Sequence, residues 1–325
     1  MTISDFEALT PDLILDSIES ALKTRLTGMT SALPSYINRV YALQTSGGEG
    51  LVAKFYRPGR WSFEAIQEEH AFVLDCAAAE IPVIAPMCLA DGTTLGRATE
   101  EIYFTVYPKR WGREVDINEG VIWRRVGMLI GCLHVVGSQK EAPHRIRLHP
   151  SKSTEADICE LLLCPLMLDD QAHAFEDVCN EILDEIEPLF TDTEAIRLHG
   201  DCHRANVLNR TGEGLMLIDF DDMVTGPPIQ DLWLMLPGHA NETERELDLM
   251  LEGYTQFRRF ERPTVQLIEP LRAMRQIYFL AWCGRQVSDY TFRHHFPEWG
   301  SRSFWNREIA DLRSQLTRIQ THLQG

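Results

Sequence analysis

The chain has 325 residues, with 31 Lys and Arg against 48 Asp and Glu, and therefore a formal net charge of −17. Its 44% apolar content is that of a folded globular protein, and its length allows two lobes that each bury a core. So acidic a chain repels the phosphates of nucleic acids, and the apolar stretch 158–168 is too short to span a membrane, so neither partner is expected.

Residues 1–108 are expected to form a small lobe built mainly on an antiparallel sheet. Apolar residues recur on one helical face from 11 to 26, and β-branched and aromatic residues flank the Gly-rich turn 46–50 as in a hairpin. The predicted order is a helix over 11–26, strands over 38–45 and 51–56, a helix over 63–79, and a strand over 102–107 that Pro108 ends.

Residues 109–325 are expected to be mainly helical. Helices are predicted over 120–136, over 155–190 with a break at Pro165, over 268–287 and over 304–323. A short strand over 196–198 and a hairpin made of 207–209 and 215–218 are the β elements predicted there. The fold class that follows is α+β, with a sheet-based first lobe and a helical second lobe.

The most informative residues lie around this second hairpin. Asp201 follows the short strand, Asn206 stands at the mouth of the hairpin, and Asp219 ends its return strand. Because a hairpin brings its two ends together, Asn206 and Asp219 are expected to face one another. An amide oxygen beside a carboxylate suits Mg²⁺, which also binds phosphate oxygens. A further carboxylate nearby, Asp201, is placed to accept the proton of a hydroxyl nucleophile.

The pattern Asp-x4-Asn, then a hairpin, then Ile-Asp-Phe resembles the catalytic and metal-binding loops of protein kinases. In the form HGDxHxxN with IDFDD it is similar to the aminoglycoside phosphotransferases and choline kinases. Further matches to the bacterial stress response kinase A family extend from about residue 30 to residue 300, at 35–41, 52–58, 68–72, 228–233 and 268–275.

This resemblance implies a two-lobed protein-kinase-like fold, with an N-terminal ATP-binding lobe over 1–108 and a C-terminal catalytic and substrate-binding lobe over 109–325. It also implies an ATP- and Mg²⁺-dependent kinase that phosphorylates Ser or Thr of proteins in a stress response. The protein acceptor rests on the resemblance alone.

The resemblance assigns a role to each candidate residue. Asp201 is the catalytic base, and Asn206 and Asp219 hold Mg²⁺. Lys54, a charge inside an otherwise apolar strand, contacts the phosphates of ATP and needs a carboxylate partner. The resemblance favours Glu69 for that partner over the adjacent Glu68, which is then a solvated helix residue.

Ser35 precedes the first predicted strand of the hairpin, at the place of the phosphate-covering loop. No glycine lies between residues 33 and 41, so the loop departs from the GxGxxG of protein kinases. Backbone N–H groups and the Ser35 hydroxyl are able to donate to phosphate, whereas an ordinary capped turn is the alternative.

Three further acids accompany the motif. Asp231 precedes an apolar run that begins a helix, and it either bonds the backbone of the catalytic loop, as the resemblance implies, or caps that helix. Asp221 and Asp222 either touch a second metal ion or are solvated acids.

The same residues also suggest other functions. His199, Cys202 and His203 have the spacing of zinc ligands, but no second Cys or His pair is near, so zinc is disfavoured. A small-molecule kinase acting on an amino alcohol, sugar or aminoglycoside is the nearer alternative. A nucleotide-binding protein without catalysis is disfavoured because Lys54, Asp201, Asn206 and Asp219 are all present.

Eight scattered cysteines without a CxxC indicate buried, reduced thiols. The N-terminus shows no leader with a basic and an apolar region. A cytoplasmic enzyme is therefore expected, and a monomer is the expected oligomeric state.

Overall fold

The computed structural model describes residues 6–35, 37–117, 119–165, 167–287 and 290–324. The chain divides into two compact units. The first, the sheet unit, comprises Met1–Asn118, Val135–Arg145 and Asp201–Met223; the second, the helical unit, comprises Glu119–His134, Ile146–Gly200 and Val224–Gly325. The hairpin with the candidate catalytic residues thus belongs to the sheet unit.

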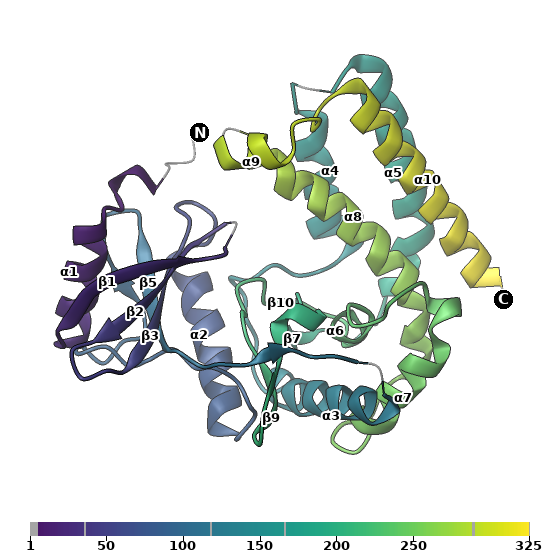
Figure 1. The fold of residues 1–325 in the computed structure, drawn as a ribbon. Helices are drawn as coiled ribbons and strands as arrows, with labels where there is room; N and C mark the ends of the chain where they lie inside the picture. Colours follow the sequence, from purple (N-terminus) through teal and green to yellow (C-terminus); the bar gives the residue numbers. More distant parts are fainter. Residues whose placement is uncertain (1–5, 36, 118, 166, 288–289, 325) are drawn as a thin grey trace. The chain divides into compact units, whose positions relative to one another are not determined.

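An antiparallel five-stranded sheet dominates the sheet unit, with the order β1-β2-β3-β5-β4 (Figure 1). Its strands are β1 (Leu26–Leu33), β2 (Arg39–Thr45), β3 (Gly50–Phe55), β4 (Gly96–Arg97) and β5 (Tyr103–Pro108). Helix α1 (Pro11–Leu22) buries Ile14 and Ile18 in the same apolar core as Phe55 and Phe104. The antiparallel sheet and the predicted hairpin of β2 and β3 are confirmed.

The expected helix over 11–26 is too long, and the strand that follows it was missed. Lys23 adopts a left-handed conformation with φ of 52° and ends α1. The backbone N–H of Leu26 then donates to Glu19 at 2.7 Å, and β1 pairs with β2. Strand β1 has mostly exposed side chains, so it lacks the alternation that marks a strand in sequence.

Helix α2 (Phe63–Ala78) begins where Ser62 accepts the N–H of Ala65. A second sheet of the same unit, with the order β6-β8-β9, comprises β6 (Arg113–Glu114), β8 (Val207–Arg210) and β9 (Gly214–Leu217). The predicted second hairpin is thereby confirmed. Phe72 of α2 contacts Phe220 edge to face, with ring centroids 5.8 Å apart, so α2 packs on the segment that follows the hairpin.

The helical unit contains most of the helices, and α5 and α10 lie side by side within it (Figure 1). Its α-helices are α4 (Glu155–Leu162), α5 (Asp169–Ile186), α6 (Ile229–Trp233), α7 (Glu244–Tyr254), α8 (Ile268–Gly284), α9 (Tyr290–His295) and α10 (Arg302–Gln324). Strand β7 (Ile196–Leu198), which was predicted, pairs with β10 (Val224–Gly226), which was not. In the two units together, short 3-10 or π turns lie at Phe6–Ala8, Pro150–Thr154, Glu187–Phe190, Arg204–Asn206, Ala240–Glu242 and Arg262–Leu267.

Helix α3 (Gly120–Gly137) is, among the described residues, the one helix long and apolar enough to cross a membrane, which residues 158–168 are not. More than half of it is buried within the protein. Its Gly127 lies against the backbone of Met250 in α7, and a Cβ there would fall 1.9 Å from the Met250 carbonyl oxygen. Gly253 of α7 lies as closely against the carbonyl of Arg124. These contacts are those of a core helix.

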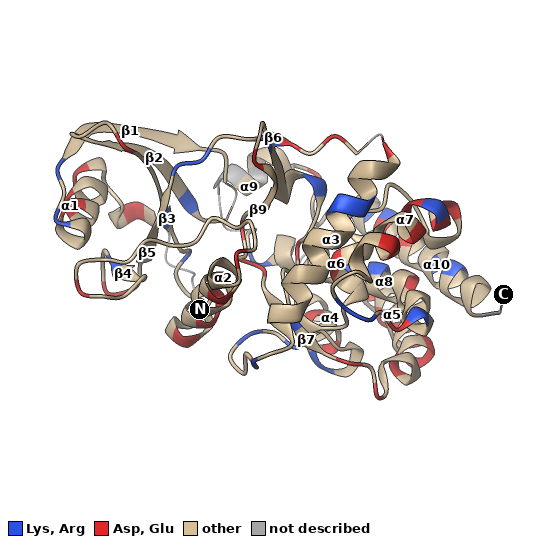
Figure 2. Cartoon of the chain, turned by 90° about the horizontal axis from the view of Figure 1, so that it is seen from below, with Lys and Arg blue, Asp and Glu red and all other residues tan. Residues whose placement is uncertain are grey.

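The acidic excess is spread over many elements. Figure 2 shows Asp and Glu on α2 of the sheet unit and on α5 and α7 of the helical unit. All eight cysteines are free thiols, as expected, but Cys88 and Cys159 are exposed rather than buried.

Candidate active site

Lys54 lies on β3, in the middle of the five-stranded sheet, where it pairs with Val40 and Thr105 of the neighbouring strands. Only 6% of the residue is exposed. Three carboxylates surround its Nζ, those of Asp221 at 2.7 Å, Asp219 at 3.4 Å and Glu69 at 3.6 Å. Burial alone would lower the pKa of Lys54, but these carboxylates outweigh it and hold the pKa well above its usual value. The ammonium therefore stays charged.

The structure brings Glu69, and not Glu68, to Lys54. Glu69 is buried on α2, where it also accepts a hydrogen bond from the Tyr56 hydroxyl at 3.3 Å. Burial raises the pKa of Glu69, and the opposing effect of Lys54 only partly offsets it. Glu68 instead contacts His144, with its Oε1 2.7 Å from Nδ1 of the imidazole ring, and accepts the backbone N–H of that residue. Glu68 is thus paired, not simply solvated.

The hairpin of β8 and β9 sets Asn206 beside Asp219. Val207 pairs with Leu217, and the N–H of Ile218 donates to the Asn206 carbonyl at 3.0 Å. Asn206 is therefore opposite Ile218, one residue from the Asp219 that we expected it to face. The Asp219 side chain is 57% exposed and its φ is 60°.

The side chain of Asn206 also contacts Asp201. Its Nδ2 donates to the Asp201 backbone carbonyl at 2.9 Å and lies 3.4 Å from the Asp201 carboxylate. The His203 ring lies on the same carboxylate, with Nε2 3.3 Å from Oδ2. Since the amide nitrogen of Asn206 is engaged, its amide oxygen is the atom left for a cation.

Asn206 and Asp219 fit the hard divalent cation that the sequence implies, because both offer oxygen ligands at neighbouring positions. The cation would neutralise phosphate charge and orient the phosphates when bound. The described part of the chain contains no group of three or more His, Cys, Asp and Glu placed to hold a metal ion.

Asp231 supports the segment that immediately precedes Asp201. It lies inside α6 and is not its N-cap. Its two carboxylate oxygens accept the backbone N–H groups of His199 at 2.8 Å and of Gly200 at 2.9 Å. Of the two expected roles, the structure therefore supports the contact with the catalytic loop.

Asp221 is buried and ion-paired, and it is therefore not a solvated acid. Its carboxylate is buried, pairs with Lys54 through Oδ1, and forms an ion pair with the Arg60 guanidinium through Oδ2. Burial by itself raises the pKa of Asp221, but Arg60 and Lys54 more than offset it, so the pKa lies below its usual value. Asp222, partly exposed, pairs with the same Arg60 at 2.6 Å.

Arg145 is a further buried residue that sequence reasoning missed. It donates to the backbone carbonyls of Met223 at 2.8 Å and of Asp221, and its guanidinium lies 3.9 Å from the ring centroid of Trp61. No local pattern marks Arg145 or Arg60, because each meets the hairpin segment across more than 75 residues of sequence.

Ser35 is exposed and lies in the link between β1 and β2, and its neighbour Tyr36 lies outside the described residues. The rest of this link is anchored. The buried Asn38 accepts the backbone N–H of Arg57 at 3.1 Å, and the Arg57 side chain donates to the Ile37 carbonyl at 3.0 Å. A link fixed in this way does not need the flexibility that glycines would provide.

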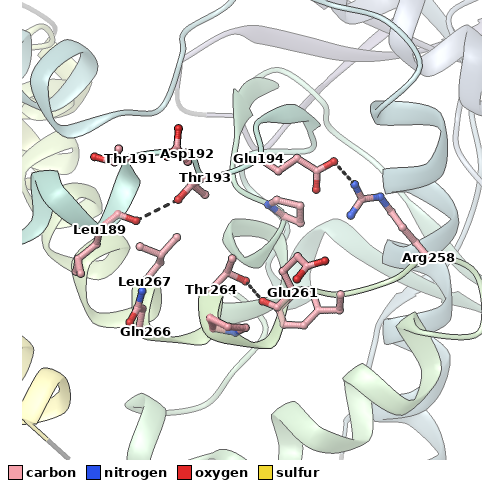
Figure 3. A pocket seen from close by; sticks show the side chains of 13 residues that line it. Leu189, Thr191, Asp192, Thr193, Glu194, Arg258, Glu261, Thr264, Gln266 and Leu267 are labelled. Carbon is pink, nitrogen blue, oxygen red and sulfur yellow. Dashed lines mark hydrogen bonds and ion pairs between the residues drawn. The ribbon is translucent and has the colours of Figure 1, made fainter.

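A pocket of about 380 Å³ lies in the helical unit (Figure 3). Thr193, Glu194, Arg258 and Glu261 are among its lining residues. Arg258 pairs with Glu194 at 2.5 Å and donates to the Tyr254 hydroxyl at 3.1 Å, so its charge is already balanced. None of the candidate catalytic or metal-binding residues lines this pocket.

The sequence profile of the phosphotransferase enzyme family matches residues 30–268. Stress response kinase A of Escherichia coli O157:H7 is 35% identical, over 97% of this chain and 95% of that protein. A protein called serine/threonine protein kinase RdoA, from Salmonella typhimurium, is 34% identical over 95% of this chain and 93% of its own length.

Solved structures with lower identity share the fold. The amicoumacin kinase hAmiN, in complex with AMP-PNP and Ca²⁺, has a TM-score of 0.71 at 18% identity, over 95% of this chain and 93% of that one. A microcompartment-associated aminopropanol kinase has a TM-score of 0.69 at 14% identity, over 97% of this chain and 98% of that one. The two-lobed kinase-like fold class is therefore confirmed, and the chain belongs to the phosphotransferase enzyme family as a kinase related over nearly its whole length to stress response kinase A.

Proposed function

We propose that this kinase transfers the γ-phosphoryl group of ATP to Ser or Thr of proteins in a bacterial stress response. Residues 1–108 are then the ATP-binding lobe and 109–325 the catalytic and substrate-binding lobe. The observation that carries the proposal is the gathering of Lys54, Asp201, Asn206 and Asp219 in one compact unit, with Asn206 bonded to Asp201 and Lys54 3.4 Å from Asp219.

In this mechanism Asp201 orients the acceptor hydroxyl and accepts its proton as the hydroxyl oxygen bonds to the γ-phosphorus, while the bond from that phosphorus to the bridging oxygen of ATP breaks and ADP leaves. Asn206 and Asp219 would hold Mg²⁺, and Lys54 would place a fixed positive charge on the nucleotide phosphates. Glu69 keeps Lys54 in position, and Ser35 with its neighbouring backbone covers the phosphates. The protein acceptor is supported by the names of the relatives, one of which is called a serine/threonine kinase.

The test is incubation of the pure protein with γ-labelled ATP and Mg²⁺, alone and with a generic protein acceptor. Wild type should label Ser or Thr, and Asp201→Asn should lower the rate by roughly 10²- to 10⁴-fold, the usual contribution of a general base. Asp311→Asn, an exposed acid on α10, is the matched control. Equal phosphotransfer rates in wild type and Asp201→Asn would contradict the role of Asp201 as the catalytic base.

A small-molecule acceptor is the second candidate. The charge of −17 favours a cationic acceptor, and proteins of similar fold are named for amicoumacin and for aminopropanol. Mg²⁺-dependent binding of AMP-PNP without any protein labelling would favour this candidate. A screen of amino alcohols, sugars and aminoglycosides would then identify the acceptor.

We further propose that the enzyme acts in the cytoplasm as a monomer. Light scattering should give a mass close to 37.2 kDa in solution. A stable mass of twice that value would contradict the monomer.

A further inference from the structure

The carboxylate nearest to Lys54 is that of Asp221, not that of Glu69. The Lys54 Nζ to Asp221 Oδ1 distance is 2.7 Å, against 3.6 Å to Glu69. Each oxygen of Asp221 faces a cation, Lys54 at Oδ1 and Arg60 at Oδ2, whereas the second oxygen of Glu69 lies 4.0 Å from the guanidinium of Arg145. Asp221 is therefore the more closely bound partner of the lysine.

Arg60 and Arg145 fix the segment that carries Asp221. Arg60 pairs with the carboxylates of Asp221 and Asp222, and Arg145 donates to the backbone carbonyls of Asp221 and Met223. The two guanidiniums lie over the ring of Trp61, at 5.3 Å and 3.9 Å from its centroid. We call Arg60, Trp61 and Arg145 the arginine clamp.

The arginine clamp also reaches α2. Arg145 donates to the Ala65 carbonyl at 3.4 Å, in the first turn of that helix, and lies 4.0 Å from the Glu69 carboxylate. One buried guanidinium thus joins the helix that carries Glu69 to the segment that follows Asp219. Removal of one member of such a buried network leaves an uncompensated charge, so separating its members is energetically costly.

We propose that Asp221, held by the arginine clamp, is a positioning residue that draws Lys54 away from a full ion pair with Asp219 and so holds it at the place where it meets the nucleotide phosphates. This inference rests on the proposed function. Without the Asp221 carboxylate, the nearest anion left to Lys54 is Asp219, at 3.4 Å. Lys54 would then pair with the carboxylate that the metal ion needs, and both ligand groups would be drawn away from the nucleotide.

The experiment is calorimetric titration of the full chain with AMP-PNP and Mg²⁺, which needs no acceptor. Asp221→Asn should weaken binding by at least about tenfold relative to wild type. Asp75→Asn is the matched control, because it breaks an exposed ion pair of the same unit, between Asp75 and Lys140, with the same chemical change. It should bind as wild type does.

A double-mutant cycle separates positioning from a general loss of structure. If Asp221 acts through Lys54, Asp221→Asn should weaken binding no further in a Lys54→Ala background. Additive losses, or wild-type affinity in a folded Asp221→Asn, would overturn the inference. If Asp221→Asn does not fold, Arg60→Gln replaces it in the double-mutant cycle with Lys54→Ala. Arg60→Gln removes one ion-pair partner of Asp221 but leaves the charges of Asp221 and Lys54 in place.

The outcomes also separate this inference from the proposed function. If wild type binds no AMP-PNP, or turns over ATP as fast as Asp201→Asn does, the proposed function fails and the inference with it. If wild type binds AMP-PNP, Lys54→Ala weakens binding and Asp221→Asn does not, only the role given to Asp221 fails.

Discussion

In the interior of the helical unit, His134 Nε2 lies 3.0 Å from Oδ2 of Asp231. The same oxygen accepts the backbone N–H of His199, and a carboxylate cannot donate, so His134 is the donor. On its other side the imidazole meets the Tyr254 hydroxyl at 3.0 Å. A fully buried chain of polar groups therefore supports the segment that leads into Asp201.

Replacement of Asp231 by Ala should be strongly destabilising. It leaves the N–H groups of His199 and Gly200 and the His134 ring without their acceptor, which should cost about 3–5 kcal/mol in the free energy of unfolding. Urea denaturation measures the loss. Glu252→Ala, which removes an exposed partner of Arg124 in the same unit, should cost less than about 1 kcal/mol. Similar costs for the two variants would contradict this account.

Glu69 and Glu68 provide a test of which acid serves Lys54. Glu69→Gln removes a buried charge 3.6 Å from Nζ, and we expect phosphotransfer to fall by about tenfold or more, since a misplaced lysine stabilises less transition-state charge. Glu68→Gln, one residue away, should stay within about twofold because its partner is His144. Steady-state phosphotransfer rates with labelled ATP measure both effects. A larger loss of rate in Glu68→Gln than in Glu69→Gln would show that Glu68, not Glu69, is the partner of Lys54.

His70 should make the protein sensitive to mild acid. Burial, with the nearby charges of Lys54 and Arg145, lowers the pKa of His70 to about 3. In the unfolded chain His70 has its usual pKa near 6.5, so below that pH it binds a proton that it does not bind in the folded chain. Stability should therefore fall as the pH drops below 6.5, and this residue should contribute a loss of about 2 kcal/mol between pH 7 and pH 5.

The check compares denaturation at pH 7 and pH 5 for wild type and His70→Gln. An uncharged Gln keeps polar atoms near Tyr56 and Thr94, the two partners of the ring at 2.9 Å and 2.8 Å, and cannot take up a proton. The difference in stability between the two pH values should shrink by about 2 kcal/mol in the variant. An unchanged difference would show that other groups cause the acid sensitivity.

Gly127, where α3 packs against α7, should not be replaceable by a residue with a side chain without loss of stability. A Cβ there falls 1.9 Å from the Met250 carbonyl oxygen, and backbone cannot yield as a flexible side chain can. Gly127→Ala should cost about 1–3 kcal/mol or more through overpacking. At Gly120 of the same helix the nearest atom, 3.4 Å away, is the end of the Leu249 side chain, so Gly120→Ala is the control and should be close to neutral.

Local patterns predicted most elements of the fold and the hairpin that carries Asn206 and Asp219. Those features depend on neighbours in sequence, such as the turn that joins β8 to β9. The pairing of Lys54 with Asp221 joins residues 167 positions apart and has no local signal. Strand β1 was missed for a related reason, because it is stabilised by pairing with β2 and not by an apolar face of its own.

The left-handed backbone at Asp219, with φ of 60°, restricts which residues can evolve at this position. Asp and Asn adopt that conformation more readily than most residues with a side chain, and of the two only Asp carries a negative charge. Glu would keep the charge but add a methylene and tolerate the backbone less well. In the proposed role of Asp219, the backbone and the cation thus favour the same amino acid, so few substitutions at this position should preserve both.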